Sequence, residues 1–201
     1  MKKSVTIAIL TGVFAAFTVM CTLNNTEQLI SDGVLRLHVI AHDNTDEEQE
    51  LKLKVRDRIL KEGRAIYGYE TKKENIRSLT MANIDRFEKA ATDEVIKNGF
   101  NHNVKVSFGK SDFPAKVYGD LCLPAGTYEA LLVEIGAGGG HNWWCVMFPP
   151  LCFVNETCRG VSPESKNLMI ETMGKDTYEM IDSKKPKIKF KVYEWWKKLS
   201  G

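Results

Sequence analysis

The sequence predicts an α+β fold: a mostly antiparallel sheet packed with two or three helices, in a single domain that follows an N-terminal signal or anchor segment. Several short stretches alternate apolar and polar residues, with the period of two that is typical of half-buried strands. Longer stretches repeat apolar residues at helical spacing. The predicted order is a strand, two helices, a group of antiparallel strands, a helix and a last strand. Hydrophobic residues make up 43% of the 201 residues, which is enough to form a core.

The N-terminus predicts export. Lys2 and Lys3 precede the uncharged stretch Val5–Met20, a pattern typical of a secretory signal peptide or a membrane anchor. This stretch has 16 residues, and a spanning helix needs roughly 20. The length therefore favours a cleaved signal, while a retained anchor would keep the chain in contact with the membrane. We divide the chain into a signal or anchor at 1–23, a linker at 24–33 and one domain at 34–201.

The first predicted strand is Val34–Ile40, where His38 falls on the solvated face. A helix is predicted from Asp46 to about Glu62. Thr45 and Glu48 match a capping box at its start, and a glycine at position 63 lies near its end.

A second helix is predicted over roughly Lys73–Lys97, because its apolar residues recur on one stripe. Ser162 and Pro163 are typical of a helix start, and this third helix is expected to reach about Ile181. Five further runs have strand character: Val104–Phe108, Lys116–Leu123, Tyr128–Ile135, Trp143–Phe148 and Lys187–Tyr193. Leu123–Gly126 is a hairpin signal between the second and third of these runs.

Charge and cysteine content narrow the function classes. The net charge is +2, which excludes a protein that binds nucleic acid by charge alone. Outside the cytosol, cysteines tend to form disulfides. Cys145 and Cys152 flank a segment with a Pro-Pro bend, so we expect a bridge between them. The alternative is that the cysteines stay reduced and pack as small apolar residues.

Two other motifs invite a chemical interpretation. Gly136–Gly140 leads into a strand and not into a helix, so we expect a flexible hairpin instead of a phosphate-binding loop. His141 and Cys145 could serve as zinc ligands or as a base and a nucleophile. However, residues four apart on one strand lie roughly 13 Å apart. We therefore expect no metal and no cofactor, and keep a cysteine- or zinc-dependent extracellular enzyme as the alternative function.

The run HNWWCVMFPPLCF carries the strongest signal in the chain. A stiff aromatic patch loses little conformational entropy on binding, so we take Trp143, Trp144, Phe148, Pro149 and Pro150 as candidates for binding a protein partner. The alternative is that they only hold the core.

This run resembles the stage II sporulation protein R family, as do FPAKVYGDLCLPAGTYEALLVEIG and VLRLHVIAHDNTDEEQELKLKVRDRIL. The resemblance extends from Val34 to about Phe153.

The resemblance implies a signalling protein of endospore formation and not an enzyme. Members of the family are made in the forespore and exported into the space between the two membranes around it. There they activate a membrane-embedded aspartic protease, which processes the precursor of a mother-cell sigma factor. The expected location is therefore the forespore membrane or the intermembrane space, and the expected partner is the protease.

Overall fold

A four-stranded sheet forms the centre of the molecule. The computed structural model describes residues 11–12, 28–152 and 161–183. The strand order is β2-β5-β1-β6, with β1 at Leu35–Ile40, β2 at Val104–Phe113, β5 at Gly126–Ile135 and β6 at Asn142–Phe148. β1 and β5 run parallel, and the two outer pairs are antiparallel. This mixed, mostly antiparallel sheet with its helices confirms the predicted α+β class.

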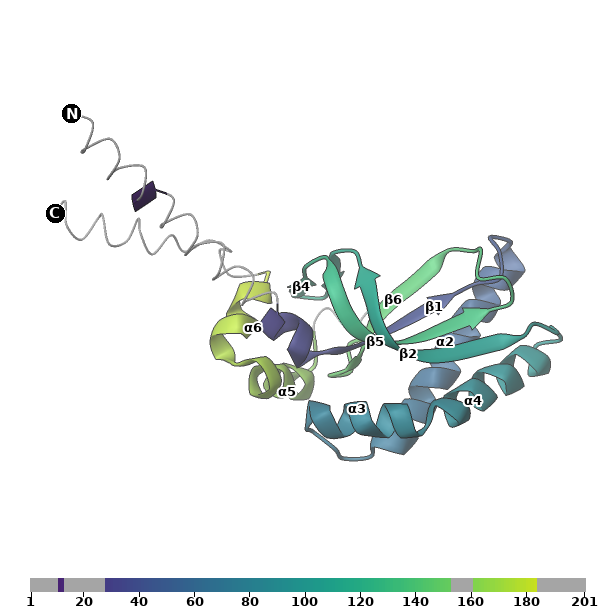
Figure 1. The fold of residues 1–201 in the computed structure, drawn as a ribbon, viewed down its shortest axis with the longest axis horizontal. Helices are drawn as coiled ribbons and strands as arrows, with labels where there is room; N and C mark the ends of the chain where they lie inside the picture. Colours follow the sequence, from purple (N-terminus) through teal and green to yellow (C-terminus); the bar gives the residue numbers. More distant parts are fainter. Residues whose placement is uncertain (1–10, 13–27, 153–160, 184–201) are drawn as a thin grey trace.

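Three helices cover one face of the sheet (Figure 1). They are α2 at Asp46–Tyr67, α3 at Lys73–Ala82 and α4 at Ile84–Lys97. The core lies between these helices and the sheet, and its fully buried members include Leu37, Val39, Val55, Ile59, Phe87, Leu131 and Val133. Burial of such side chains contributes about 1.5–3 kcal/mol each and holds the two layers together.

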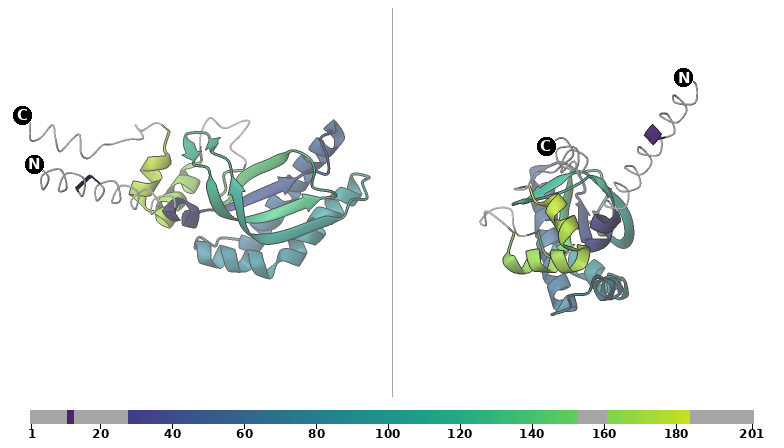
Figure 2. Two further views of the ribbon diagram at one scale, coloured as in Figure 1. Left: turned by 45° about the horizontal axis from the view of Figure 1, so that its top comes forward. Right: turned by 90° about the vertical axis from the view of Figure 1, so that its left-hand side faces the viewer.

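A second, smaller unit lies at one end of the sheet (Figures 1 and 2). It contains the two-stranded hairpin of β3 at Lys116–Tyr118 and β4 at Leu121–Leu123, with the helices α5 at Pro163–Met173 and α6 at Lys175–Ile181. Lys166 of α5 forms an ion pair with Asp120, the turn residue of the hairpin, at 2.5 Å. Residues 28–33, where a linker was predicted, are helical and bury Ile30 against the core.

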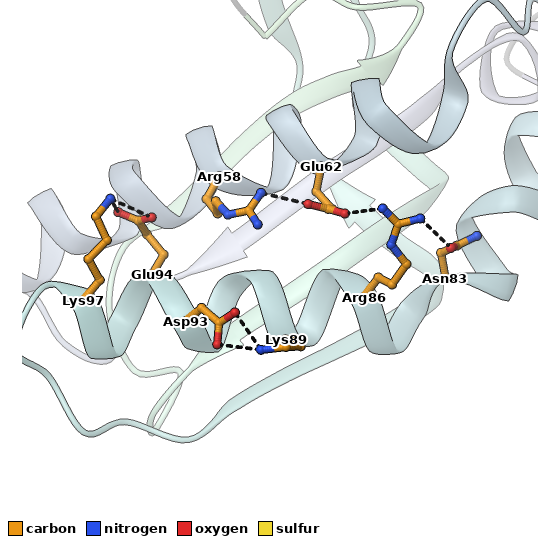
Figure 3. A network of polar contacts seen from close by, with 8 residues as sticks. All are labelled: Arg58, Glu62, Asn83, Arg86, Lys89, Asp93, Glu94 and Lys97. Atoms are coloured by element: carbon orange, nitrogen blue, oxygen red, sulfur yellow. Dashed lines mark hydrogen bonds and ion pairs between the residues drawn. The ribbon is translucent and has the colours of Figure 1, made fainter.

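An ion pair between Glu62 and Arg86 joins α2 to α4 (Figure 3). Glu62 of α2 accepts from Arg58 on its own helix at 2.8 Å and from Arg86 of α4 at 2.6 Å. Burial alone would raise the pKa of Glu62, but the two arginines outweigh burial and lower it. The carboxylate is therefore charged at neutral pH and couples the two helices.

Two of the predicted helices are each interrupted in the structure, so the prediction of continuous helices is wrong there. The helix expected over Lys73–Lys97 is interrupted at Asn83, whose side-chain amide donates to the carbonyl of Leu79 at 2.8 Å. Such competition for backbone groups is how asparagine ends helices. The helix expected to reach Ile181 is interrupted at Gly174, which has a φ of 82°. The described part of the chain thus has the helices α2 to α6 in addition to the helical residues 28–33, where two or three helices were expected.

The expected helix end at Gly63 is also wrong, because α2 continues to Tyr67. Gly63 is buried, and a Cβ atom there would lie 2.5 Å from the Cε atom of Met147 in β6. The glycine therefore allows close packing of α2 on the sheet instead of ending the helix.

The capping box at the start of α2 does not form. The hydroxyl of Thr45 donates to Asp43 Oδ1 at 2.7 Å, and Glu48 turns inward to His102, at 2.6 Å from its Nε2. In contrast, the cap at α5 is confirmed: Ser162 Oγ accepts from the N–H of Ser165 at 3.2 Å.

The extended run Lys116–Leu123 folds back on itself at Gly119, which has a φ of 59°. The hairpin turn therefore lies within this run. The prediction of a hairpin turn at Leu123–Gly126 is wrong. β5 instead pairs with β1 and β2. The predicted strand Lys187–Tyr193 lies outside the described residues.

Candidate functional site

Strand β6 carries the candidate aromatic residues at one edge of the sheet. It pairs with β1 alone among the described strands, and the register places Trp143 opposite Val39 and Trp144 opposite His38. Neighbouring side chains of a strand point to opposite faces. The two tryptophans therefore project from the two sides of one edge strand and do not form a single flat patch.

Trp143 lies on the helix-covered side. The guanidinium carbon of Arg56, on α2, lies 4.4 Å from the centroid of the Trp143 ring, which is a favourable cation–π distance. Arg56 is held from the other side by Asp57 at 2.8 Å. The tryptophan is half-buried, and its indole N–H has no acceptor within the described residues.

Trp144 lies on the opposite, more open face. Its ring stacks on His38 with centroids 5.7 Å apart, and Lys116 Nζ lies 5.5 Å from the ring centroid. Its carbonyl accepts from the hydroxyl of Tyr118 at 3.3 Å. Trp144 is also half-buried, so part of each tryptophan remains accessible to a partner.

The ring of His38 stacks on that of Trp144. The sequence predicted that His38 would lie on a solvated face of its strand. The structure places it at 9% exposure, with Nε2 at 2.7 Å from Asn142 Oδ1 and Nδ1 at 3.3 Å from Ser111 Oγ. Burial lowers the pKa of the imidazole, although the contact with Asn142 acts in the other direction. The ring is therefore neutral at pH 7 and fixed by contacts on both nitrogens.

A disulfide closes the turn after β6. Cys145 and Cys152 are bonded, with Cα atoms 5.2 Å apart, and the N–H of Leu151 donates to the carbonyl of Val146 at 3.1 Å. This confirms the predicted bridge. The turn occupies the outer edge of β6 beyond Val146, so this end of the strand is protected from pairing with another chain.

The remaining candidates divide by burial. Phe148 and Pro149, joined by a cis peptide bond, are buried, and Pro150 is exposed. The carbonyl of Pro150 accepts from Ser165 Oγ at 3.1 Å, which ties the turn to α5. Trp143, Trp144 and Pro150 thus have surface to offer a partner, whereas Phe148 and Pro149 act by holding the turn in place.

Sequence reasoning missed a buried arginine beneath this site. Arg36 of β1 has no exposed surface, and its guanidinium carbon lies 4.0 Å from the ring centroid of Phe113 and 4.7 Å from that of Tyr128. It donates to the hydroxyl of Tyr118 at 2.8 Å, and its Nη1 has no partner in the described part of the chain. Burial lowers the pKa of Arg36, and the Tyr118 hydroxyl opposes this.

Arg36 packs the β3–β4 hairpin onto the face opposite the helices. Its alternation with Leu35 and Leu37 suggested a half-solvated strand, and nothing local in the sequence indicates that a hairpin more than 80 residues away covers it. The one available signal was the group of aromatic residues in the strands that surround it.

The glycine-rich loop is not the flexible hairpin that was expected. It connects β5 to β6, between which β1 lies in the sheet. The amides of Gly139 and Gly140 donate to the carbonyls of His42 and Ala41, and the amide of Ala137 donates to His42 Nδ1 at 2.9 Å. With these N–H groups already bound within the protein, the loop has no free nest of donors for a phosphate.

The geometry does not bring His141 and Cys145 together as a reactive pair. The Cys145 sulfur is buried in the disulfide, while His141 is exposed before the start of β6. A nucleophile or a zinc ligand requires a free thiolate. Among residues 28–152 and 161–183, no group of three His, Cys, Asp or Glu side chains is placed to hold a metal.

The N-terminal prediction falls almost entirely outside the described residues. Within the part that the structure describes, no helix is both long enough and apolar enough to cross a bilayer. The proposed signal or anchor thus remains a prediction from the sequence.

Comparison with known proteins identifies a family. The family model "Stage II sporulation protein R" matches residues 31–158, which include every element from β1 to the disulfide turn. Stage II sporulation protein R of Bacillus subtilis (strain 168) is 36% identical over 163 residues, which cover 77% of this chain and 73% of that protein. No solved structure matches the chain.

Proposed function

This chain belongs to the stage II sporulation protein R family, and from that premise we propose that it is an exported signal that activates a membrane-embedded aspartic protease during endospore formation. The protease then processes the precursor of a mother-cell sigma factor. Membership of the family, which assigns a role in sporulation, is the observation that carries the proposal.

The N-terminal sequence supports export. Two lysines precede an uncharged apolar stretch, Val5–Met20, and such a segment directs a chain out of the cytosol. The Cys145–Cys152 disulfide suits an oxidising compartment. We place the protein at the forespore membrane, facing the space between the two membranes.

The edge of β6 supports a role in contact. Trp143 and Trp144 are rigid, half-exposed and bracketed by the cations Arg56 and Lys116. Aromatic and arginine side chains dominate the energetics of protein interfaces. We propose that Trp144, together with Lys116 beside it, contacts the protease from the face that the helices leave uncovered.

Reconstitution tests the proposal. The full chain, the protease and the sigma-factor precursor are placed in one membrane system, with precursor cleavage as the readout. We expect cleavage only when this chain is present on the external side of the membrane. Equal cleavage without the chain would contradict the proposal.

Cysteine variants in the same assay separate contact from catalysis by this chain. The bridge closes a small loop and contributes about 2–3 kcal/mol to stability. Cys145→Ser and Cys152→Ser should therefore lower the thermal midpoint equally and reduce cleavage equally. If Cys145→Ser alone abolished cleavage while the stability of the protein was kept, Cys145 would act as a nucleophile and the alternative enzyme function would stand.

A further inference from the structure

The outer edge of β2 is a long strand edge without a partner in the described part of the chain. β2 lies at the end of the sheet opposite β6 and pairs with β5 in an unbroken register from Val104 to Phe113. No described strand lies on its other side. Exposed edges of this length template the addition of another strand, so proteins protect them or use them.

The direction of the backbone groups on β2 follows from two hydrogen bonds. The carbonyl of Asn103 accepts from Gly136 on the β5 side at 2.8 Å, whereas the N–H of Val106 donates outward to Glu88 of α4 at 3.0 Å. Backbone groups alternate along an antiparallel strand. The groups of Phe108, Lys110 and Asp112 therefore point outward, away from β5.

The end of this edge carries exposed charged residues, which usually protect a sheet edge from pairing, so a partner strand has to match them with opposite charges. Gly109, Lys110 and Asp112 are exposed, and a Cβ atom at Gly109 would meet nothing within 4 Å. Lys110 and Asp112 point to the same face, two positions apart, with opposite charges. Neither forms an ion pair with another described residue, although Asp112 Oδ1 accepts from Thr127 Oγ1 at 2.6 Å.

We propose that β2 pairs with β2 of a second copy of this chain, antiparallel and centred on Ser111. In this register Lys110 of each copy lies opposite Asp112 of the other, so the charges are complementary on both sides of the twofold axis. Gly109 lies opposite Phe113, whose ring is buried in its own copy against Arg36 and Tyr128, so the charged pairs carry the register. Directly opposed charges of opposite sign stabilise such pairs.

The geometry of the pair limits its strength. Pro114 follows β2 and lacks an N–H, so the ladder is short. A single short strand pair lies at the small end of specific interfaces, and we therefore expect a reversible dimer with one continuous sheet through both copies. The edge of β6 lies at the opposite end of each sheet and stays free to contact the protease.

Reciprocal charge exchange tests the pairing in the full chain, purified in mild detergent and followed by sedimentation velocity over a range of concentrations. K110D places two aspartates opposite each other, and D112K places two lysines opposite each other. Each single variant should shift the chain to monomer by at least tenfold in dissociation constant. The double variant K110D/D112K should restore the dimer.

Lys105→Asp is the matched control, because Lys105 is an exposed lysine of β2 that lies outside the proposed register. It should leave the dimer unchanged. A wild-type chain that is monomeric at every concentration overturns the proposal, as does a dimer that K110D and D112K leave intact.

Cross-linking gives a second readout. Ser111 lies opposite its own copy at a position without hydrogen bonds between the strands, where Cα atoms approach to about 4.5 Å. Ser111→Cys should therefore trap a disulfide-linked dimer above the background from the native cysteines, whereas Ser107→Cys, four residues away on the same face, should not. Equal trapping at both positions contradicts the register.

Hydrogen exchange distinguishes a second copy from a segment of the same chain. In the dimer, protection of the Lys110 and Asp112 amides should rise with protein concentration. If these amides are protected equally at every dilution, the chain covers its own edge and the proposal fails.

Discussion

Single residues determine how the face opposite the helices is built. Arg36 is fully buried among aromatic rings, no carboxylate of the described residues pairs with it, and Tyr118 ties it to the β3–β4 hairpin. An uncompensated buried charge is costly, so the stacking and hydroxyl contacts are needed to hold it. The hairpin in turn leaves Trp144 at the border between the covered and the open part of this face.

His38 predicts a pH dependence of stability. Its pKa in the folded protein lies below the ordinary value of 6.5, because burial disfavours the charged ring. The unfolded chain therefore binds the proton first as the pH falls. The contribution of His38 to the free energy of unfolding is complete above about pH 6.5. It is lost progressively as the pH falls below this value and passes through the pKa of the folded state.

The measurement compares the wild type with His38→Gln by urea unfolding between pH 7.5 and about pH 5. The free energy of unfolding of the wild type should fall more steeply on acidification than that of the variant. The other three histidines are present in both proteins, so the difference between the two curves reports the change at position 38. Parallel curves for the two proteins would show that His38 is not the buried neutral ring described here.

At the scale of elements, local sequence patterns predicted the strands and helix starts that depend on neighbouring residues. Alternation located β1, an apolar run located β6, and Ser162 with Pro163 located the start of α5, because each of these signals depends on adjacent residues. The interruptions at Asn83 and Gly174 were not predictable from apolar spacing, which continues across both. The hairpin at Gly119 and the burial of Arg36 depend on contacts between distant segments, and no local pattern records these.

Gly63 provides a test of packing between elements. Alanine is the better helix former by roughly 1 kcal/mol, yet a Cβ atom at position 63 would collide with Met147 Cε. We expect Gly63→Ala to lower the free energy of unfolding by about 1–3 kcal/mol, as overpacking does. Met147→Val removes the colliding atom, so the loss in the double variant should be smaller than the sum of the two single losses.

Urea unfolding of the four proteins measures this coupling. A Gly63→Ala variant that is more stable than the wild type would mean that the glycine serves helix flexibility and not close packing.

At the scale of the whole molecule, the sheet presents two different edges. The β6 edge is closed at one end by the disulfide turn and carries the two tryptophans, whereas no strand of the described residues pairs with the outer side of β2. This division separates the proposed contact with the protease from the proposed contact between copies. The sequence predicted the candidate binding residues as one continuous run. The fold was needed to separate the accessible members of this run from the buried ones.

The most direct test of the central claim is the affinity of the full chain for the protease in proteoliposomes, compared between the wild type and Trp144→Ala. Ile96→Ala is the control, because Ile96 is a large apolar side chain that is 60% exposed on α4, away from β6. Loss of an aromatic anchor costs about 2 kcal/mol, so Trp144→Ala should weaken binding roughly 30-fold while its unfolding midpoint stays near that of the wild type. An affinity unchanged by Trp144→Ala, or lowered equally by Ile96→Ala, would contradict the claim that the β6 edge is the contact surface.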